Sequence, residues 1–176
     1  MSIYQNQKST KPKPEDVATD FLDNKKAESF LDIIDFIRAD KINISWVSGN
    51  SWGLNVKGKR IAFLKICNGN WLFRQQPRHM KFYNEMKNDD LKNFVCSYIR
   101  AKTCIDGICD EHPNMPKTDI SAPNVCTCWP LRIYNPNKED LEHTKLLIAY
   151  SKNYILNELQ SKKANGYPLH SEIIEI

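Results

Sequence analysis

Residues 42–75 read INISWVSGNSWGLNVKGKRIAFLKICNGNWLFRQ, and this stretch decides the fold. Four short apolar runs alternate there with turn signals at Gly49-Asn50, at Lys57-Gly58-Lys59 and at Asn68-Gly69. An Asn-Gly pair between apolar runs is typical of a β-hairpin, because a type I′ turn needs positive φ at both central residues. The stretch therefore predicts four antiparallel strands joined by tight turns.

The turns also predict which side chains share a face of the sheet, since alternate residues of a strand point to opposite sides. A two-residue turn at 57–58 or 58–59 gives a first face with Trp52, Leu54, Val56, Ile61 and Phe63. A turn at 68–69 gives a second face with Ala62, Leu64, Ile66, Trp71 and Phe73, to which a two-residue turn at 49–50 adds Ile42, Ile44 and Trp46. A one-residue error in that last turn would move the three added residues across. The third strand is then apolar on both sides, so we expect the first helix to cover one face, and the other face, with Trp52 and Phe63, to be covered by a later segment or to line a pocket.

Helical patterns flank this stretch. Apolar residues at helical spacing predict one helix over 24–39, capped by Asp23 or Asn24, and a second from Asn88 to about Arg100. A short strand over 131–134 precedes a long helix from Asn137 to about Lys163. Together these elements predict an α+β fold: an antiparallel β-meander of four or more strands covered by helices, with a Cys-rich loop and a long C-terminal helix.

One domain is expected over residues 15–163, with a flexible tail over 1–14 and a second tail over 164–176. The 176 residues carry a net charge of +4. The sequence contains no apolar run approaching the roughly 18 residues that span a bilayer. Its N-terminus has no apolar segment typical of a secretory signal. We therefore expect a cytoplasmic protein without a membrane partner.

Residues 103–129 have no periodic pattern and contain four of the six cysteines. They form two close pairs, Cys104 with Cys109 and Cys126 with Cys128. Zinc is commonly held by two such pairs, and a site with four protein ligands is structural rather than catalytic. We therefore predict a structural zinc on these cysteines, with nearby His112 as a substitute ligand. Disulfides or free thiols are the alternatives.

Five large aromatic residues fall within the predicted sheet: Trp46, Trp52, Phe63, Trp71 and Phe73. The less covered face of a curved sheet can line a pocket for a small apolar ligand. Trp52 and Phe63 are the candidate walls of such a pocket, and Lys65 is its main candidate polar contact, with Asn43 and Ser45. In the interpretation that we favour, all five aromatic residues belong to the core, because large aromatic side chains dominate ordinary cores.

Basic residues crowd one hairpin tip, at Lys57, Lys59 and Arg60, and others follow nearby, namely Lys65, Arg74, Arg78 and Lys81. With interleaved aromatic residues they suit phosphate contacts and base stacking. A solvated tip and edge is the other interpretation. No recognised nucleic-acid motif accompanies these charges, so we do not expect nucleic acid as the partner.

No common catalytic or nucleotide-binding motif occurs in the sequence. We therefore favour a binding or interaction domain over an enzyme, with a structural zinc and a small apolar ligand or a protein as its partner. Two alternatives stay open. One is a small enzyme that uses a reactive cysteine or an open metal position near His112, and the other is a nucleic-acid-binding accessory protein that uses the 57–60 tip.

Residues 46–66 contain the pattern W-x5-W-G-L-N-V-K-G-K-R-I-A-F-L-K-I, followed by N-W-L-F at 70–73. This pattern resembles the core of small bacterial domains of the YdhG-like group. The resemblance implies a compact α+β fold with a curved antiparallel sheet, a central K-G-K hairpin and a following apolar strand. Some members of the group are discussed as frataxin-like iron-handling proteins, so the resemblance also implies a remote link to iron. It carries over no site residue.

Metal analysis of the purified protein, with a thiol titration under denaturing conditions, tests the zinc prediction. We expect about one zinc per chain and all six thiols free after denaturation, because metal binding does not consume thiolates. Cys109→Ser should lower the metal content. Full metal content with an unchanged fold would remove Cys109 from the ligand set, and four missing thiols would indicate disulfides instead.

Overall fold

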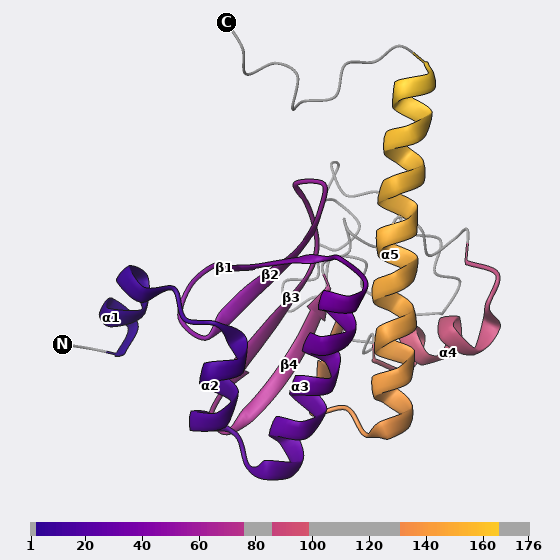
Figure 1. Cartoon of the computed structure of the whole chain (residues 1–176). Coiled ribbons are helices and arrows are strands. Elements are labelled where there is room, and N and C mark those ends of the chain that lie inside the picture. The colour runs from indigo at the N-terminus through magenta and orange to yellow at the C-terminus, as the bar shows by residue number, and fades with distance from the viewer. Residues whose placement is uncertain (1–2, 76–85, 99–130, 166–176) are drawn as a thin grey trace, which may run out of the picture.

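A computed structural model describes residues 3–75, 86–98 and 131–165 and shows an α+β fold around one antiparallel sheet (Figure 1). The sheet has five strands in the order β1-β2-β3-β4-β5. They are β1 Asn43–Trp46, β2 Ser51–Val56, β3 Lys59–Cys67, β4 Asn70–Gln75 and β5 Leu131–Tyr134. Every neighbouring pair is antiparallel, which confirms the predicted meander of four or more strands.

The described helices are α1 Ile3–Thr10, α2 Pro14–Phe21, α3 Asn24–Ala39, α4 Asp89–Tyr98 and α5 Lys138–Ala164. Asp23, Asn88 and Asn137 cap α3, α4 and α5, and each side-chain Oδ1 accepts a hydrogen bond of 2.9 Å from a backbone N–H of the first turn. Such a cap satisfies a donor that the helix itself cannot pair. Within the described residues the three predicted helices, including the long C-terminal one, are confirmed.

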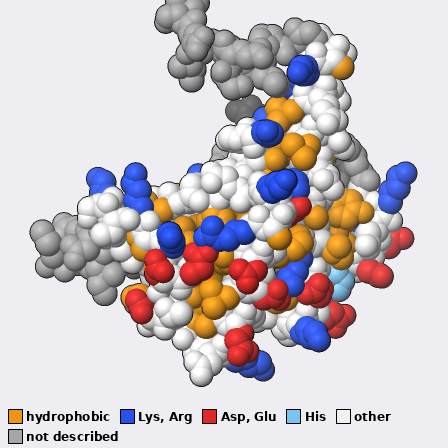
Figure 2. All heavy atoms as spheres, viewed as in Figure 1, with side chains coloured by type: hydrophobic (Ala, Val, Ile, Leu, Met, Phe, Trp, Pro, Cys, Tyr) orange, Lys and Arg blue, Asp and Glu red, His pale blue; other side chains and the backbone are white. Residues whose placement is uncertain are grey.

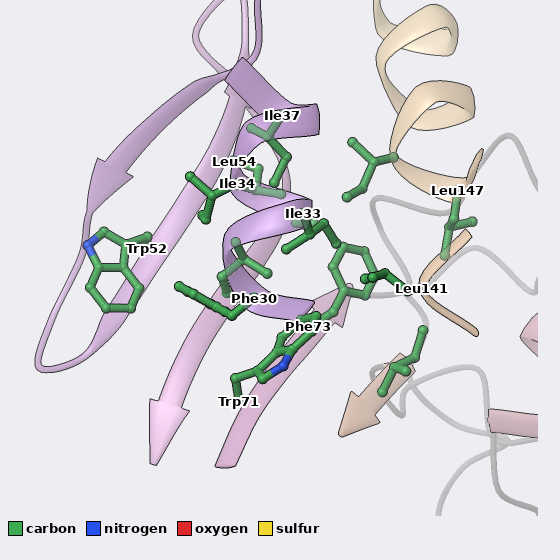
Figure 3. Packing of buried hydrophobic residues seen from close by; sticks show 14 of the residues in the cluster. Phe30, Ile33, Ile34, Ile37, Trp52, Leu54, Trp71, Phe73, Leu141 and Leu147 are labelled. Atoms are coloured by element: carbon green, nitrogen blue, oxygen red, sulfur yellow. The ribbon is translucent and has the colours of Figure 1, made fainter. Parts of the chain in front are cut away.

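The apolar core lies between one face of the sheet and the layer of α2, α3 and α5 (Figure 1, Figure 3). At its centre, the ring of Phe30 lies 6.2 Å from that of Trp52 and 5.4 Å, edge-on, from that of Trp71. Both buried indole N–H groups have partners, because Trp71 donates to Ser29 Oγ at 3.0 Å and Trp52 donates to the Pro12 carbonyl at 2.9 Å. Aromatic rings with satisfied polar tips therefore fix α3 on the sheet.

Two of the three predicted turns have the expected length. Backbone φ is positive at Lys57, Gly58, Asn68 and Gly69, as tight hairpin turns of this type require. The first connection is longer than expected. Trp46 pairs with Trp52, and the Val47 N–H donates to the Ser51 carbonyl at 2.9 Å, so residues 48–50 form a three-residue loop in place of a two-residue turn.

Strand β3 carries one extra residue opposite β2. Asn55 pairs with Arg60, but the preceding Leu54 pairs with Ala62, so Ile61 has no partner across the ladder. This is a β-bulge, in which two residues of one strand oppose one residue of the other. Beyond the bulge, each side chain of β3 therefore lies on the face opposite to the one it would have in an unbulged pairing with β2.

The bulge changes which side chains share a face. Trp52 pairs with Leu64 on the helix-covered face, whereas Phe63 points to the opposite side. The predicted common face of Trp52 and Phe63 is therefore wrong. Ile44 and Trp46 still lie on the face that we predicted for them, because the longer first loop and the bulge each shift the alternation once.

The second side of β3 is not a continuous apolar surface. It presents Phe63 half-buried, Lys65 exposed and Cys67 half-buried. The described helices lie on the other side of the sheet or beside its edges (Figure 1). Among the described residues, the helical cover that we expected from 24–39 is found on one face, and no described helix covers the other (Figure 1).

Helices α1 and α2 occupy positions where the sequence predicted no helix. The Gln7 side-chain amide donates to Asn50 Oδ1, and Val17 and Ala18 of α2 are buried in the core. Helices this short depend on tertiary contacts rather than on their own propensity, so their sequence signal is weak. The flexibility of residues 1–14 stays a prediction.

One buried amide ties the bulge to α5. Gln75 is 0% exposed, and its Nε2 donates to the Ile61 carbonyl at 3.2 Å and to Ser151 Oγ at 2.8 Å. Ser151 in turn donates to the Leu147 carbonyl at 2.7 Å. A bulged residue is left out of the ladder, so Gln75 supplies a partner that the Ile61 carbonyl needs when buried.

Gln75→Met keeps the approximate size of this side chain and removes both donated hydrogen bonds. We expect the free energy of unfolding in urea to fall by about 2 kcal/mol, because the Ile61 carbonyl is left buried without its partner. Gln160→Met, at an exposed position of α5, is the matched control and should change stability by no more than about 0.5 kcal/mol. Equal effects of the two substitutions would contradict this role of Gln75.

Candidate anion-binding face of the sheet

The sheet face turned away from α3 and α5 is covered by no described helix (Figure 1) and is called here the open face. It gathers basic side chains from several strands. In one row across it, Phe63 of β3 lies opposite Arg74 of β4, which lies opposite Arg132 of β5. The next row consists of Lys65, Leu72 and Tyr134 on the same three strands. Residues that are well separated along the chain therefore become neighbours.

Arg60 extends the first row toward β2. Its guanidinium lies over the ring of Phe63, 4.9 Å from the centroid, and its Nε donates to Asn55 Oδ1 at 3.3 Å. Gly53, the partner of Phe63 on β2, leaves room for this group, since a Cβ there would lie 2.5 Å from Arg60 Nε. The missing side chain thus allows the guanidinium to rest against the sheet, where the cation–π contact stabilises it.

A hollow of about 750 Å³ opens on this face. Its walls include Phe63, Lys65, Arg74, Arg132 and Tyr134. Ile66, Leu72, the loop at 47–51, the turn at 67–69 and Phe21 at the end of α2 complete its lining. A hollow of this volume lies in the range of pockets that hold small molecules.

All the charged side chains in the described lining of the hollow are basic. Its lining includes no Asp or Glu among the described residues, and neither Lys65 nor Arg74 forms a salt bridge with any of them. Nε of Arg74 is buried without a hydrogen-bond partner in the described part of the chain. Such a donor costs free energy that a bound anion recovers. The helix side differs, because Asp and Glu lie there among Lys and Arg (Figure 2).

The structure separates the residues that we predicted as an aromatic pocket. Phe63 and Lys65 line the hollow, whereas Trp52 is 1% exposed in the core on the other face. On β1, Asn43 is exposed, and Ser45 Oγ accepts a hydrogen bond of 2.8 Å from the Asn55 amide. The favoured interpretation of the aromatic residues is correct for Trp52, Trp71 and Phe73, which are buried, and wrong for Phe63.

The basic hairpin tip does not form a single cluster. Lys57 is exposed at the turn, Lys59 Nζ lies 3.3 Å from Glu158 Oε2 of α5, and Arg60 extends over the open face. Arg78 and Lys81 lie outside the described residues. The positive charge of this region is therefore gathered on the open face rather than at the tip.

The predicted zinc ligands all lie outside the described residues: Cys104, Cys109, Cys126, Cys128 and His112. In residues 3–75, 86–98 and 131–165, no three or more His, Cys, Asp or Glu side chains are grouped to hold a metal ion. Cys67, at the end of β3, is a free thiol. The zinc site stays a prediction from the cysteine spacing.

A second polar cluster joins α4 to the first turns of α5. The Tyr98 hydroxyl donates to Asp140 Oδ2 at 2.6 Å, and the rings of Phe94 and His143 stack with centroids 4.7 Å apart. Burial, followed by the hydrogen bond to Asp140, raises the pKa of Tyr98 to about 12. The hydroxyl therefore remains a protonated donor at neutral pH, and the cluster serves to pack two helices together.

Searches of protein-family models, of curated proteins and of solved structures find no significant match for this chain. Over the described ranges, no helix combines the length and the apolar character needed to cross a bilayer. The open face therefore has to be interpreted from its own chemistry.

Sequence reasoning missed Arg132 and Tyr134 as site residues and left Arg74 unassigned to a face. The signal for Arg74 was present, since Trp71 and Phe73 were placed on the core face and residue 74 alternates with them. Arg132 and Tyr134 had no such signal. More than 50 residues separate β5 from β4, so the sequence offers no tight turn from which their register could be predicted.

The close approach of Arg60 to Gly53 predicts energetic coupling between them. Gly53→Ala should destabilise the protein by about 1 kcal/mol, because the guanidinium must leave its position over Phe63. In an Arg60→Ala background the same substitution should be neutral or stabilising, since alanine is the better strand residue. A double-mutant cycle in urea measures the difference. Additive effects would show that Arg60 does not occupy this position in solution.

Proposed function

We propose that this chain is a binding protein whose open face holds an anionic ligand. One observation supports the proposal above others. Lys65, Arg74 and Arg132 converge on a single hollow whose described lining contains no carboxylate. Arg60 adds a fourth positive charge beside it.

The electrostatics of such a surface favour anions. Lys65 and Arg74, which form no salt bridge with the described residues, raise the local positive potential, and a concave low-dielectric wall concentrates it. Guanidinium groups also present several N–H donors in a fixed plane that matches carboxylate and phosphate oxygens. Arginine predominates here, which favours recognition of oxyanions over non-specific attraction of any negative charge.

The hollow also has an apolar component. Phe63, Tyr134 and the buried side chain of Leu72 lie among the cations. Ligand sites typically combine apolar walls with a few polar groups that fix orientation. The proposed ligand therefore has an oxyanion and a flat or apolar part, which revises our sequence-based expectation of a small apolar ligand.

We also propose that Cys104, Cys109, Cys126 and Cys128 hold a structural zinc. Support for this part comes from the two pairs of cysteines in the sequence and from the need of an aperiodic 27-residue loop for an anchor. The enzymatic alternative near His112 rests on the same stretch. Metal analysis tests the zinc, and the anion-binding proposal uses no residue of that stretch.

Calorimetric titration with inorganic tripolyphosphate tests the anion-binding proposal, since this probe supplies charge without any apolar part. Lys65→Gln and Arg74→Gln should each weaken binding about fivefold, because each removes one charge-assisted contact. Lys163→Gln, at an exposed position near the end of α5, is the matched control and should bind as the unaltered protein does. Equal losses in all three variants, or no binding at all, would overturn the proposal.

A further inference from the structure

Tyr134 is a feature that anion binding alone does not require. Its side chain is 52% exposed although it lies in the sheet, and it is one of the large apolar residues most open to solvent in the described residues. Within the described part of the chain it forms no ring contact. An exposed ring beside cations offers a flat surface on which another ring can stack.

The cations of the first row extend over a considerable length. The guanidinium of Arg60 lies against Gly53 of β2, and Arg74 and Arg132 follow on β4 and β5. Neighbouring strands are about 4.8 Å apart, so the row is roughly 14 Å long. A nucleic-acid strand in B-form spaces its charges about 3.4 Å apart along the axis. The row is therefore long enough for several consecutive phosphates and too long for one.

Taken together, these features identify a class of partner. We infer that the open face binds single-stranded nucleic acid, with a base stacked on Tyr134 and the phosphates along Arg60, Arg74 and Arg132. This inference rests on the anion-binding function proposed above and names its ligand. It replaces our sequence-based expectation that nucleic acid is not the partner, which was made before the register had gathered these residues.

A single strand suits this surface better than a duplex does. Stacking on Tyr134 needs a base whose flat side is accessible, and pairing in a duplex hides the bases inside the stack. Leu72 and then Lys65 follow Tyr134 along the same row, and all three line the hollow, so a base over the ring would also contact an apolar floor and a cation. Aromatic stacking accepts every base, so little sequence preference is expected.

Fluorescence anisotropy with a single-stranded oligothymidylate of about 12 nucleotides tests this inference on the full-length protein. We expect log Kd to rise with log salt with a slope of about 2, because about three phosphates are neutralised. Tyr134→Ala should weaken binding about tenfold, whereas Tyr134→Phe, which keeps the ring, should bind as the unaltered protein does. Both substitutions lie at an exposed position, so the fold should tolerate them.

The control probes separate failure of this inference from failure of the anion-binding proposal. A duplex of the same length and thymidine monophosphate should each bind at least tenfold more weakly than the oligonucleotide. If tripolyphosphate binds but Tyr134→Ala leaves oligonucleotide affinity unchanged, the nucleic-acid inference is overturned and anion binding stands. The same conclusion follows if the duplex or the mononucleotide binds as tightly as the single strand. If neither tripolyphosphate nor the oligonucleotide binds, both proposals fall.

Discussion

The extra residue at Ile61 is the constraint on which the arrangement of the two sheet faces depends. Without it, Trp52 would share a face with Phe63, and neither face could be both apolar and continuous. With it, the large side chains of β2, β3 and β4 come together under Phe30. The buried amide of Gln75 stabilises the bulge from within the core, so one hydrogen-bonded side chain maintains the separation of the faces.

The same separation explains why cations gather on the open face. The apolar side chains of β3, β4 and β5 point toward the core, so the alternate side chains point away from it, and these include Lys65, Arg74 and Arg132. Lys65 and Arg74 form no salt bridge with the described residues, so their mutual repulsion lowers the stability of the free protein. A sheet fixes its side chains in rows, so the repulsion cannot be relieved by moving the backbone. A surface that keeps such a loss of stability in the free protein is expected to regain the free energy when an anion binds.

The helix layer makes the sheet a rigid support for this surface. Lys152 of α5 donates to the Asp40 carbonyl at 2.9 Å and so ties α5 to the end of α3. Asn135, which follows β5, accepts a hydrogen bond of 2.9 Å from the Trp71 backbone N–H and donates to Asn70 Oδ1 at 2.7 Å. These contacts hold β5 in register with β4. A site built on strands whose partners are fixed in this way is positioned more accurately than one on loops.

The sequence by itself determined the local elements, because turns and helix caps depend on neighbouring residues. These elements are the turns at 57–58 and 68–69 and the helix caps Asp23, Asn88 and Asn137. The sequence also determined the alternation that buries Trp71 and Phe73. Only the tertiary structure decided the bulge at Ile61, the position of Trp52 in the core and the pairing of Arg74 with Arg132. Those features depend on packing and on register between distant segments. A register shift of one residue reverses every face, and no local signal in the sequence records it.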